Sequence, residues 1–282
     1  SRFLNNWLLS IGNKQLLITE GDKRNLDPLH LSNQWSQGFA SWIQRMTKEG
    51  FLCENLDISL STQLLKSYEH KDRITQAWLD KKLPLEGSIS EITLARWLPR
   101  LIQTEIPIML AASSPVRDWL SYSGRYALRR QCFGFRGASG IDGTLSLAMG
   151  LSKARGPMLL VTGDLALLHD TNGWLFAHAK EIPLVVLLID NSGGGIFTQL
   201  DVQTESNKTF EKFFLMPQSI DFLALARTYG ISYRQVSCLQ DLQAALDWGF
   251  SKSAPALIRL CTNAHLDASK RNNIRMEHAN LF

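Results

Sequence analysis

The sequence has little cysteine and no long apolar run. Its four cysteines lie at positions 53, 132, 238 and 261, too far apart for the CxxC pairs of structural metal sites. We expect them to be reduced, buried thiols of an intracellular chain. The longest apolar run, Leu184 to Ile189, is far shorter than the roughly 20 residues that span a bilayer. We therefore expect no membrane span.

The sequence also lacks long runs of residues with the same charge. The 30 basic and 26 acidic residues leave a net charge of +4 and are spread along the 282 residues, without the basic arm that nucleic-acid partners favour. Composition therefore gives no support for nucleic-acid binding. Apolar residues make up 45% of the chain, which is enough for a substantial core.

The chain begins without a methionine or a signal-peptide pattern, and Arg2 to Leu9 already has helical apolar spacing. We therefore expect the sequence to be a piece of a longer protein. We expect that protein to be cytoplasmic, or plastidic if it comes from a photosynthetic eukaryote.

Apolar patterning divides the chain near residue 85. Residues 1–85 are expected to form the end of a central α/β domain and a linker, with a strand at 15–19 and helices at 36–48 and 66–83. Residues 86–282 alternate between apolar strands and helices, which predicts an α/β fold with three α/β/α layers and a mostly parallel sheet. The predicted strands lie at 107–112, near 132, and at 158–162, 184–189, 232–236 and 256–261, and the predicted helices at 92–103, 116–122, 141–154, 171–180, 219–229 and 239–251.

Polar loops follow two consecutive strands of this pattern. Gly163 and Asp164 come after the strand at 158–162, and Asn191 comes after the next strand, followed by a run of three glycines. In a parallel pair the two loops lie side by side beyond the carboxyl ends, where ligands bind. Carboxylate and amide oxygens suit Mg²⁺, or Mn²⁺, holding a diphosphate. Gly193 and Gly194 allow backbone groups to approach the cation and the phosphates closely.

Each loop taken alone is also typical of an ordinary turn. A dinucleotide-binding Rossmann fold would need GxGxxG after its first strand, and no such spacing follows either candidate strand. The pairing of the two loops favours the cation site, with Asp164, Asn191 and Gly193 as the metal-binding residues.

The paired loops resemble the bipartite magnesium and diphosphate motif of thiamine diphosphate-dependent enzymes. Leu165 stands where most of that superfamily has a second glycine, and this form is similar to the menaquinone-pathway synthase branch. The resemblance covers nearly the whole chain, most weakly at 41–85 and after 261. Two further segments resemble motifs of that branch, Arg136-Gly137-Ala138-Ser139-Gly140-Ile141-Asp142-Gly143 and Ser113-Ser114-Pro115-Val116-Arg117-Asp118.

Arg117 and Arg136 follow predicted strand ends, and guanidinium groups pair bidentately with carboxylates, so we expect acidic substrates. For either arginine alone, an ordinary surface salt bridge stays open. The resemblance implies 2-oxoglutarate, which loses CO₂, and isochorismate, to which the resulting succinyl carbanion equivalent is added. It also implies that Ser113 helps the two arginines to hold the substrate carboxylates.

The resemblance further implies that Ile141 lies under thiamine diphosphate and bends it, while an ordinary core role stays open for this residue. Ile196 and Phe197 would form an apolar wall that excludes water. We assign His169 no catalytic role and expect Asp170 to cap a helix that begins at Thr171. The implied cofactor-binding residues are Gly137, Ala138, Ser139, Ile141, Gly163, Asp164, Leu165, Asn191, Gly193 and Gly194.

The resemblance also implies a partner. In this superfamily an activating glutamate lies in an amino-terminal domain, so we expect the site to need the N-terminal half of the same enzyme and a homodimer or homotetramer. Two other functions stay open: another thiamine diphosphate-dependent 2-oxoacid decarboxylase or synthase, and a non-catalytic phosphate-binding α/β module.

Overall fold

The computed structural model describes residues 2–12, 14–21, 24–50, 58–127, 129–135, 140–178, 182–200 and 207–281. The chain forms two compact units, residues 1–72 and 73–282. The division falls inside the helix α3 (Ile58–Lys82), earlier than the boundary expected near residue 85. The assignment of residues 1–85 to a central domain and linker stays a prediction.

The first unit contains a small parallel sheet. The strand β1 (Gln15–Ile18) pairs in register with β2 (Ser32–Trp35). In the sequence, α1 (Arg2–Ser10) precedes this pair and α2 (Gly38–Lys48) follows it. The predicted strand and helices are present, whereas β2 was not predicted because its sequence, Ser-Asn-Gln-Trp, is polar.

The second unit is built on a six-stranded sheet in which every pair is parallel, with the strand order β4-β3-β5-β6-β8-β7. The sequence pattern predicted all six strands. Every residue of β6 is buried. A continuous apolar run such as Leu184 to Ile189 is typical of a strand that is covered on both faces. The strands are β3 (Ile108–Leu110), β4 (Cys132–Gly134), β5 (Met158–Gly163), β6 (Leu184–Asp190), β7 (Ser232–Val236) and β8 (Ala256–Cys261).

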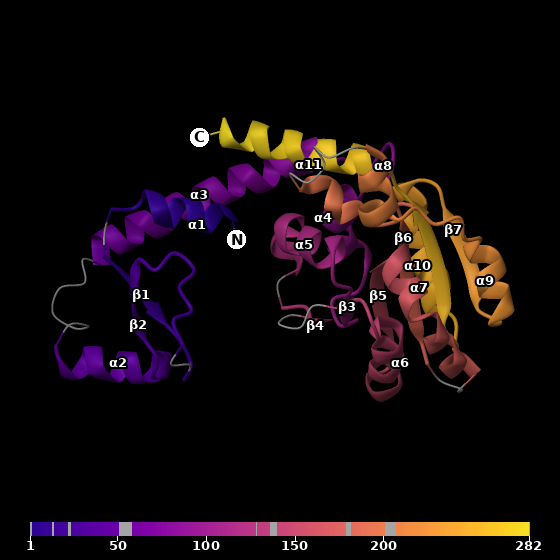
Figure 1. Ribbon diagram of the computed structural model, residues 1–282, viewed down its shortest axis with the longest axis horizontal. Coiled ribbons are helices and arrows are strands. Elements are labelled where there is room, and N and C mark those ends of the chain that lie inside the picture. Colours follow the sequence, from indigo (N-terminus) through magenta and orange to yellow (C-terminus); the bar gives the residue numbers. More distant parts are fainter. Residues whose placement is uncertain are drawn as a thin grey trace. The chain divides into compact units, whose positions relative to one another are not determined.

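Helices pack on both faces of this sheet (Figure 1). Alternate residues of β6 divide between two cores: Val185 and Leu187 lie in one, and Val186 and Leu188 in the other. The predicted three-layer α/β/α fold is confirmed. The first core is covered by α4 (Glu91–Leu101), α5 (Ser114–Tyr122) and α10 (Leu242–Phe250), and the second by α6 (Thr144–Arg155), α7 (Asp164–His169), η2 (Thr171–His178) and α9 (Phe222–Thr228).

The last helix, α11 (Ala264–Ala279), was not predicted because its sequence is strongly polar. Asn263 caps its first turn by accepting two backbone N–H bonds. The helix packs on α4 and runs along the end of α3, where Lys82 pairs with Glu277 at 2.5 Å (Figure 1). The remaining short elements are η1 (Gly124–Ala127), η3 (Gly195–Gln199), α8 (Asn207–Phe210), η5 (Glu211–Leu215) and η6 (Leu239–Asp241).

Two local expectations were wrong. Cys132 and Cys261 are exposed and Cys238 is half-buried; the first two lie at strand ends, and position 53 lies outside the described residues. Asp170 does not cap the segment after it. Its carboxylate instead accepts hydrogen bonds from the backbone N–H and the hydroxyl of Ser146, at 2.6 and 2.9 Å, and so caps the start of α6 from a neighbouring element.

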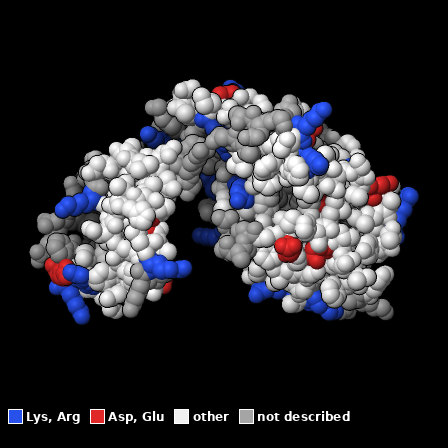
Figure 2. Space-filling model, in the orientation of Figure 1, with Lys and Arg blue, Asp and Glu red and all other residues white. Residues whose placement is uncertain are grey.

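The surface is mixed in charge. On the face drawn in Figure 2, lysine and arginine side chains are scattered together with aspartate and glutamate among larger uncharged areas. Within the described ranges of the chain, no helix is long and apolar enough to cross a membrane.

Candidate functional site

The connections of the sheet change direction between two adjacent strands. The chain leaves β3 for β4 on one side and leaves β5 for β6 on the other. Ligands of open parallel sheets bind in the crevice at such a switch point, beyond the carboxyl ends of the strands. A cavity of about 280 Å³ lies at this place.

The predicted site residues within the described part of the chain all contribute to this one cavity. The predicted residues Arg136, Gly137, Ala138 and Ser139 lie outside the described residues, and the roles of all the predicted residues stay predictions. Those that line the cavity are Ser113, Arg117, Ile141, Gly163, Asp164, Leu165, Asn191, Gly193, Gly194, Ile196 and Phe197.

Asp164 joins the ends of β5 and β6. It begins α7 and is only 2% exposed. Its Oδ1 accepts the backbone N–H of Leu165 and its Oδ2 accepts that of Gly193, both at 2.7 Å. The two loops predicted to lie side by side are thus held together by the carboxylate.

Burial raises the pKa of Asp164 to about 7, although its two backbone N–H bonds act in the opposite direction. The neighbouring carboxylate of Asp190 also raises this pKa. Asp190 is itself paired with Arg259 at 2.6 Å. A buried carboxylate of this kind is well suited to a cation, because the positive charge offsets the cost of burying the negative one.

Asn191 presents an unused oxygen. Its Nδ2 donates to Oε1 of Glu91 at 2.6 Å. Its Oδ1 is buried and has no hydrogen-bond partner among the described residues. An orphaned buried oxygen beside a buried carboxylate fits a hard cation such as Mg²⁺. Within the described residues, no group of three or more His, Cys, Asp or Glu side chains is arranged to hold a metal ion, so a cation held here would take its remaining ligands from backbone, water or diphosphate.

The glycine run after Asn191 is required by its surroundings. Gly193 has φ +134°, and a Cβ there would collide with the backbone oxygen of Leu215. The N–H of Gly194 donates to the same oxygen at 2.6 Å. The loop therefore packs its backbone directly against η5, which a residue with a side chain could not do.

Ser113 and Arg117 line the same cavity, Ser113 from the position just before α5 and Arg117 from α5 itself. Ser113 has φ +83°, a conformation that costs a non-glycine residue energy and often occurs at functional sites. Nη1 of Arg117 donates to the Ser113 carbonyl at 2.7 Å. Arg117 is exposed, and a guanidinium has further N–H groups for a ligand.

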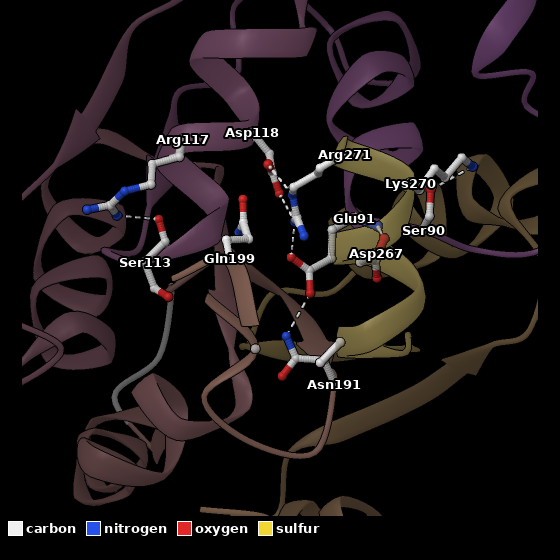
Figure 3. A network of polar contacts seen from close by, with 12 residues as sticks. Ser90, Glu91, Ser113, Arg117, Asp118, Asn191, Gln199, Asp267, Lys270 and Arg271 are labelled. Carbon is white, nitrogen blue, oxygen red and sulfur yellow. Dashed lines mark hydrogen bonds and ion pairs between the residues drawn. The ribbon is translucent and has the colours of Figure 1, made fainter. Parts of the chain in front are cut away.

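Sequence reasoning missed a buried polar network behind Asn191 (Figure 3). Glu91, at the start of α4, and Asp118, on α5, both accept from Arg271 of α11. Glu91 also lines the cavity. For Glu91 the only local signal was Ser90, which caps α4; a glutamate just after such a cap is usually explained by the helix dipole alone.

Nδ1 of His169 lies 3.3 Å from Oδ1 of Asp142. Both side chains are largely exposed, 57% and 82%. The assignment of no catalytic role to His169 stays a prediction.

The family model of "Thiamine pyrophosphate enzyme, C-terminal TPP binding domain" matches residues 117–260, about half of the chain. The chain belongs to this family of thiamine pyrophosphate enzymes.

Among curated proteins, the chain is similar to 2-succinyl-5-enolpyruvyl-6-hydroxy-3-cyclohexene-1-carboxylate synthases. It is 57% identical over 275 residues to that of Prochlorococcus marinus strain MIT 9313, covering 98% of this chain and 47% of the relative. It is 51% identical over 278 residues to that of Parasynechococcus marenigrum strain WH8102, covering 98% and 48%. The chain thus spans about half the length of the curated relatives it matches.

Two solved structures share the fold. Benzoylformate decarboxylase from Polynucleobacter necessarius aligns with a TM-score of 0.51 at 18% identity, over 61% of this chain and 33% of that one. The thiamine diphosphate-dependent 4-hydroxybenzoylformate decarboxylase of Rhodococcus jostii RHA1 aligns with a TM-score of 0.51 at 21% identity, over 63% and 33%. At these identities the likeness concerns the fold alone.

Proposed function

We propose that the chain is the cofactor-binding half of a thiamine diphosphate-dependent transferase. The enzyme would release CO₂ from 2-oxoglutarate and add the remaining succinyl group to isochorismate, giving 2-succinyl-5-enolpyruvyl-6-hydroxy-3-cyclohexene-1-carboxylate for menaquinone or phylloquinone biosynthesis. The observation that carries this proposal is the single cavity that joins the Asp164 and Asn191 loops with Ser113 and Arg117. The names of the similar synthases support the choice of substrates.

Three oxygens would hold Mg²⁺ or Mn²⁺: the Asp164 carboxylate, Oδ1 of Asn191 and the carbonyl of Gly193. Oδ1 is buried without a partner among the described residues. The Gly193 carbonyl accepts one N–H bond, from Gly195 at 2.9 Å, and a carbonyl oxygen has a second lone pair. Hard oxygens of this number leave coordination positions for the cofactor's diphosphate.

When bound, thiamine diphosphate supplies the electron sink for decarboxylation. The chain's own residues position the cofactor and substrates and keep water away. Ile141, Ile196 and Phe197 line the cavity, and their apolar side chains would lower water access to the reacting atoms. Arg117 would orient a substrate carboxylate through the N–H groups that do not serve Ser113.

We also propose that this half acts together with the N-terminal half of the same enzyme, in a homodimer or homotetramer. The relatives are about twice as long as the matched segment. A cavity lined by one half is then completed by the other.

Arg117 gives the most direct test of substrate class. In the full-length protein, CO₂ release and product formation are measured with 2-oxoglutarate and isochorismate, and with pyruvate and benzoylformate as alternative donors. Arg117→Gln should lower kcat/KM for an acidic substrate about tenfold or more, because a charge-assisted hydrogen bond is lost. Arg227→Gln, at an exposed position on α9, is the matched control and should change little. A preference for pyruvate or benzoylformate, or an unchanged Arg117→Gln variant, would contradict the proposal.

A further inference from the structure

The buried network behind the cavity contains three charged side chains from three helices. Glu91 is 3% exposed, Asp118 6% and Arg271 2%. Nε of Arg271 donates to Oδ1 of Asp118 at 3.0 Å, and its Nη2 donates to Oδ2 of Asp118 and to Oε2 of Glu91 (Figure 3). Buried charges persist only when paired and hydrogen-bonded, so Arg271 holds both carboxylates in place.

The two oxygens of the Glu91 carboxylate have different partners. Oε2 is occupied by Arg271, and Oε1 accepts Nδ2 of Asn191 at 2.6 Å. A carboxylate oxygen can only accept a hydrogen bond. The Asn191 amide must therefore turn its nitrogen toward Glu91, which turns its oxygen, Oδ1, the other way.

A steric observation shows how closely this amide is packed. A Cβ at Gly195 would lie 2.6 Å from Nδ2 of Asn191. Only glycine at this position leaves room for the amide nitrogen to reach Glu91. The glycine run thus preserves the space for the amide as well as the turn itself.

We propose that Glu91, held by Arg271, is a positioning residue that orients the Asn191 amide so that its oxygen faces the cation. This inference rests on the cation site of the proposed function. It connects α11, through Arg271 and Glu91, to the cofactor site at the end of β6. Groups that orient a metal ligand commonly change metal affinity 10- to 100-fold when they are removed.

Substitutions that exchange one oxygen and one nitrogen test the orientation of the Asn191 amide. In Glu91→Gln, Arg271 holds the Gln oxygen, so the new amide nitrogen faces Asn191. Two donors repel each other, and the Asn191 amide turns and presents nitrogen to the cation. In Asn191→Asp the opposite problem occurs, because two carboxylate oxygens face each other. In the double variant the Gln nitrogen donates to the Asp oxygen, and the other Asp oxygen remains for the cation.

The experiment measures the Mg²⁺ dependence of thiamine diphosphate binding by calorimetry in the full-length protein, with Mn²⁺ electron paramagnetic resonance as a spectroscopic readout of the cation. Glu91→Gln should raise the half-saturating Mg²⁺ concentration about tenfold or more when residue 191 is Asn. The same substitution should lower that concentration when residue 191 is Asp. Glu105→Gln and Asn272→Asp, at exposed positions, are the matched controls.

An effect of the same sign in both backgrounds, or no effect in either, would overturn the inference. If Glu91→Gln lowers the thermal unfolding temperature so far that the protein does not fold, Gly195→Ala decides the question. It displaces the Asn191 amide without touching the ion pairs and should also weaken Mg²⁺ binding about tenfold; unchanged binding would refute the orientation. If the parent protein needs no cation to bind the cofactor, the proposed function fails instead.

Discussion

Ser113 combines a cavity position with backbone strain. Its φ of +83° is rarely adopted by residues with a Cβ. The carbonyl of Ser113 accepts a hydrogen bond from the Arg117 guanidinium. Such conformations cost about 1 to 3 kcal/mol and are retained where the surroundings impose them. The role of the Ser113 hydroxyl stays a prediction.

Ser113→Gly should therefore stabilise the fold by about 1 kcal/mol, because glycine adopts positive φ without a steric cost. The same change should weaken substrate binding by removing the hydroxyl. Chemical denaturation, and the KM of the full-length protein for the proposed substrate 2-oxoglutarate, measure the two effects. Ser114→Gly, inside the first turn of α5, should instead destabilise the protein. A Ser113→Gly variant that loses stability would contradict this account of the strain.

Individual site residues could be predicted from sequence only where the signal is local. Asp164 and Asn191 follow two apolar strands, and their pairing needs no more than the rule for parallel strand ends. Glu91 could not be found in this way, because its partners are 100 and 180 positions away, at Asn191 and Arg271. No periodicity within a helix indicates which distant charge it will meet.

Among the strands and helices, the apolar content of each segment determined whether it could be predicted from the sequence. The runs that form β5 and β6 are buried on both sides, and such runs are typical of central parallel strands. The short polar strand β2 and the polar helix α11 gave no comparable signal. Gly163 and Asp164 were expected in a loop, with the next helix at 171–180. Instead the helix α7 begins at Asp164, and Thr171–His178 forms the 3-10 helix η2.

Asp267, in the first turn of α11, has a buried carboxyl group. Oδ1 of Asp267 accepts the backbone N–H of Glu91 at 2.9 Å, and its Oδ2 has no partner in the described part of the chain. Burial raises the pKa of Asp267 to about 7, and the nearby Glu91 and Asp118 carboxylates add to this, while Arg271 opposes it. Lys270, whose pKa is lowered by burial, is the other charged neighbour on α11.

A raised pKa means that the folded state binds the proton more tightly than the unfolded state. The contribution of Asp267 to stability is therefore complete below about pH 4 and is lost as the pH rises through about 7. Asp267→Asn should flatten the fall in the free energy of unfolding over this range, by up to about 1.4 kcal/mol per pH unit. Urea unfolding at several pH values tests this, with exposed Asp247→Asn as control. Parallel pH profiles for parent and Asp267→Asn would refute it.

At the scale of the whole molecule, the chain spans about half the length of its curated relatives. We predict that the isolated 282 residues bind thiamine diphosphate weakly and do not catalyse the reaction. The full-length protein should bind the cofactor tightly and catalyse it. Calorimetry and product analysis on the two proteins compare them directly. Succinyl transfer by the isolated chain would show that no second half is needed.

We propose that Asp164 and Asn191 hold the cation that binds the cofactor's diphosphate. The test is to titrate thiamine diphosphate with Mg²⁺ into the full-length protein, and to repeat the titration with Asp164→Ala and Asn191→Ala, and with exposed Asn272→Ala as control. We predict that each of the two site variants loses magnesium-dependent binding while the control retains it. Cofactor binding that survives both site substitutions would contradict the account.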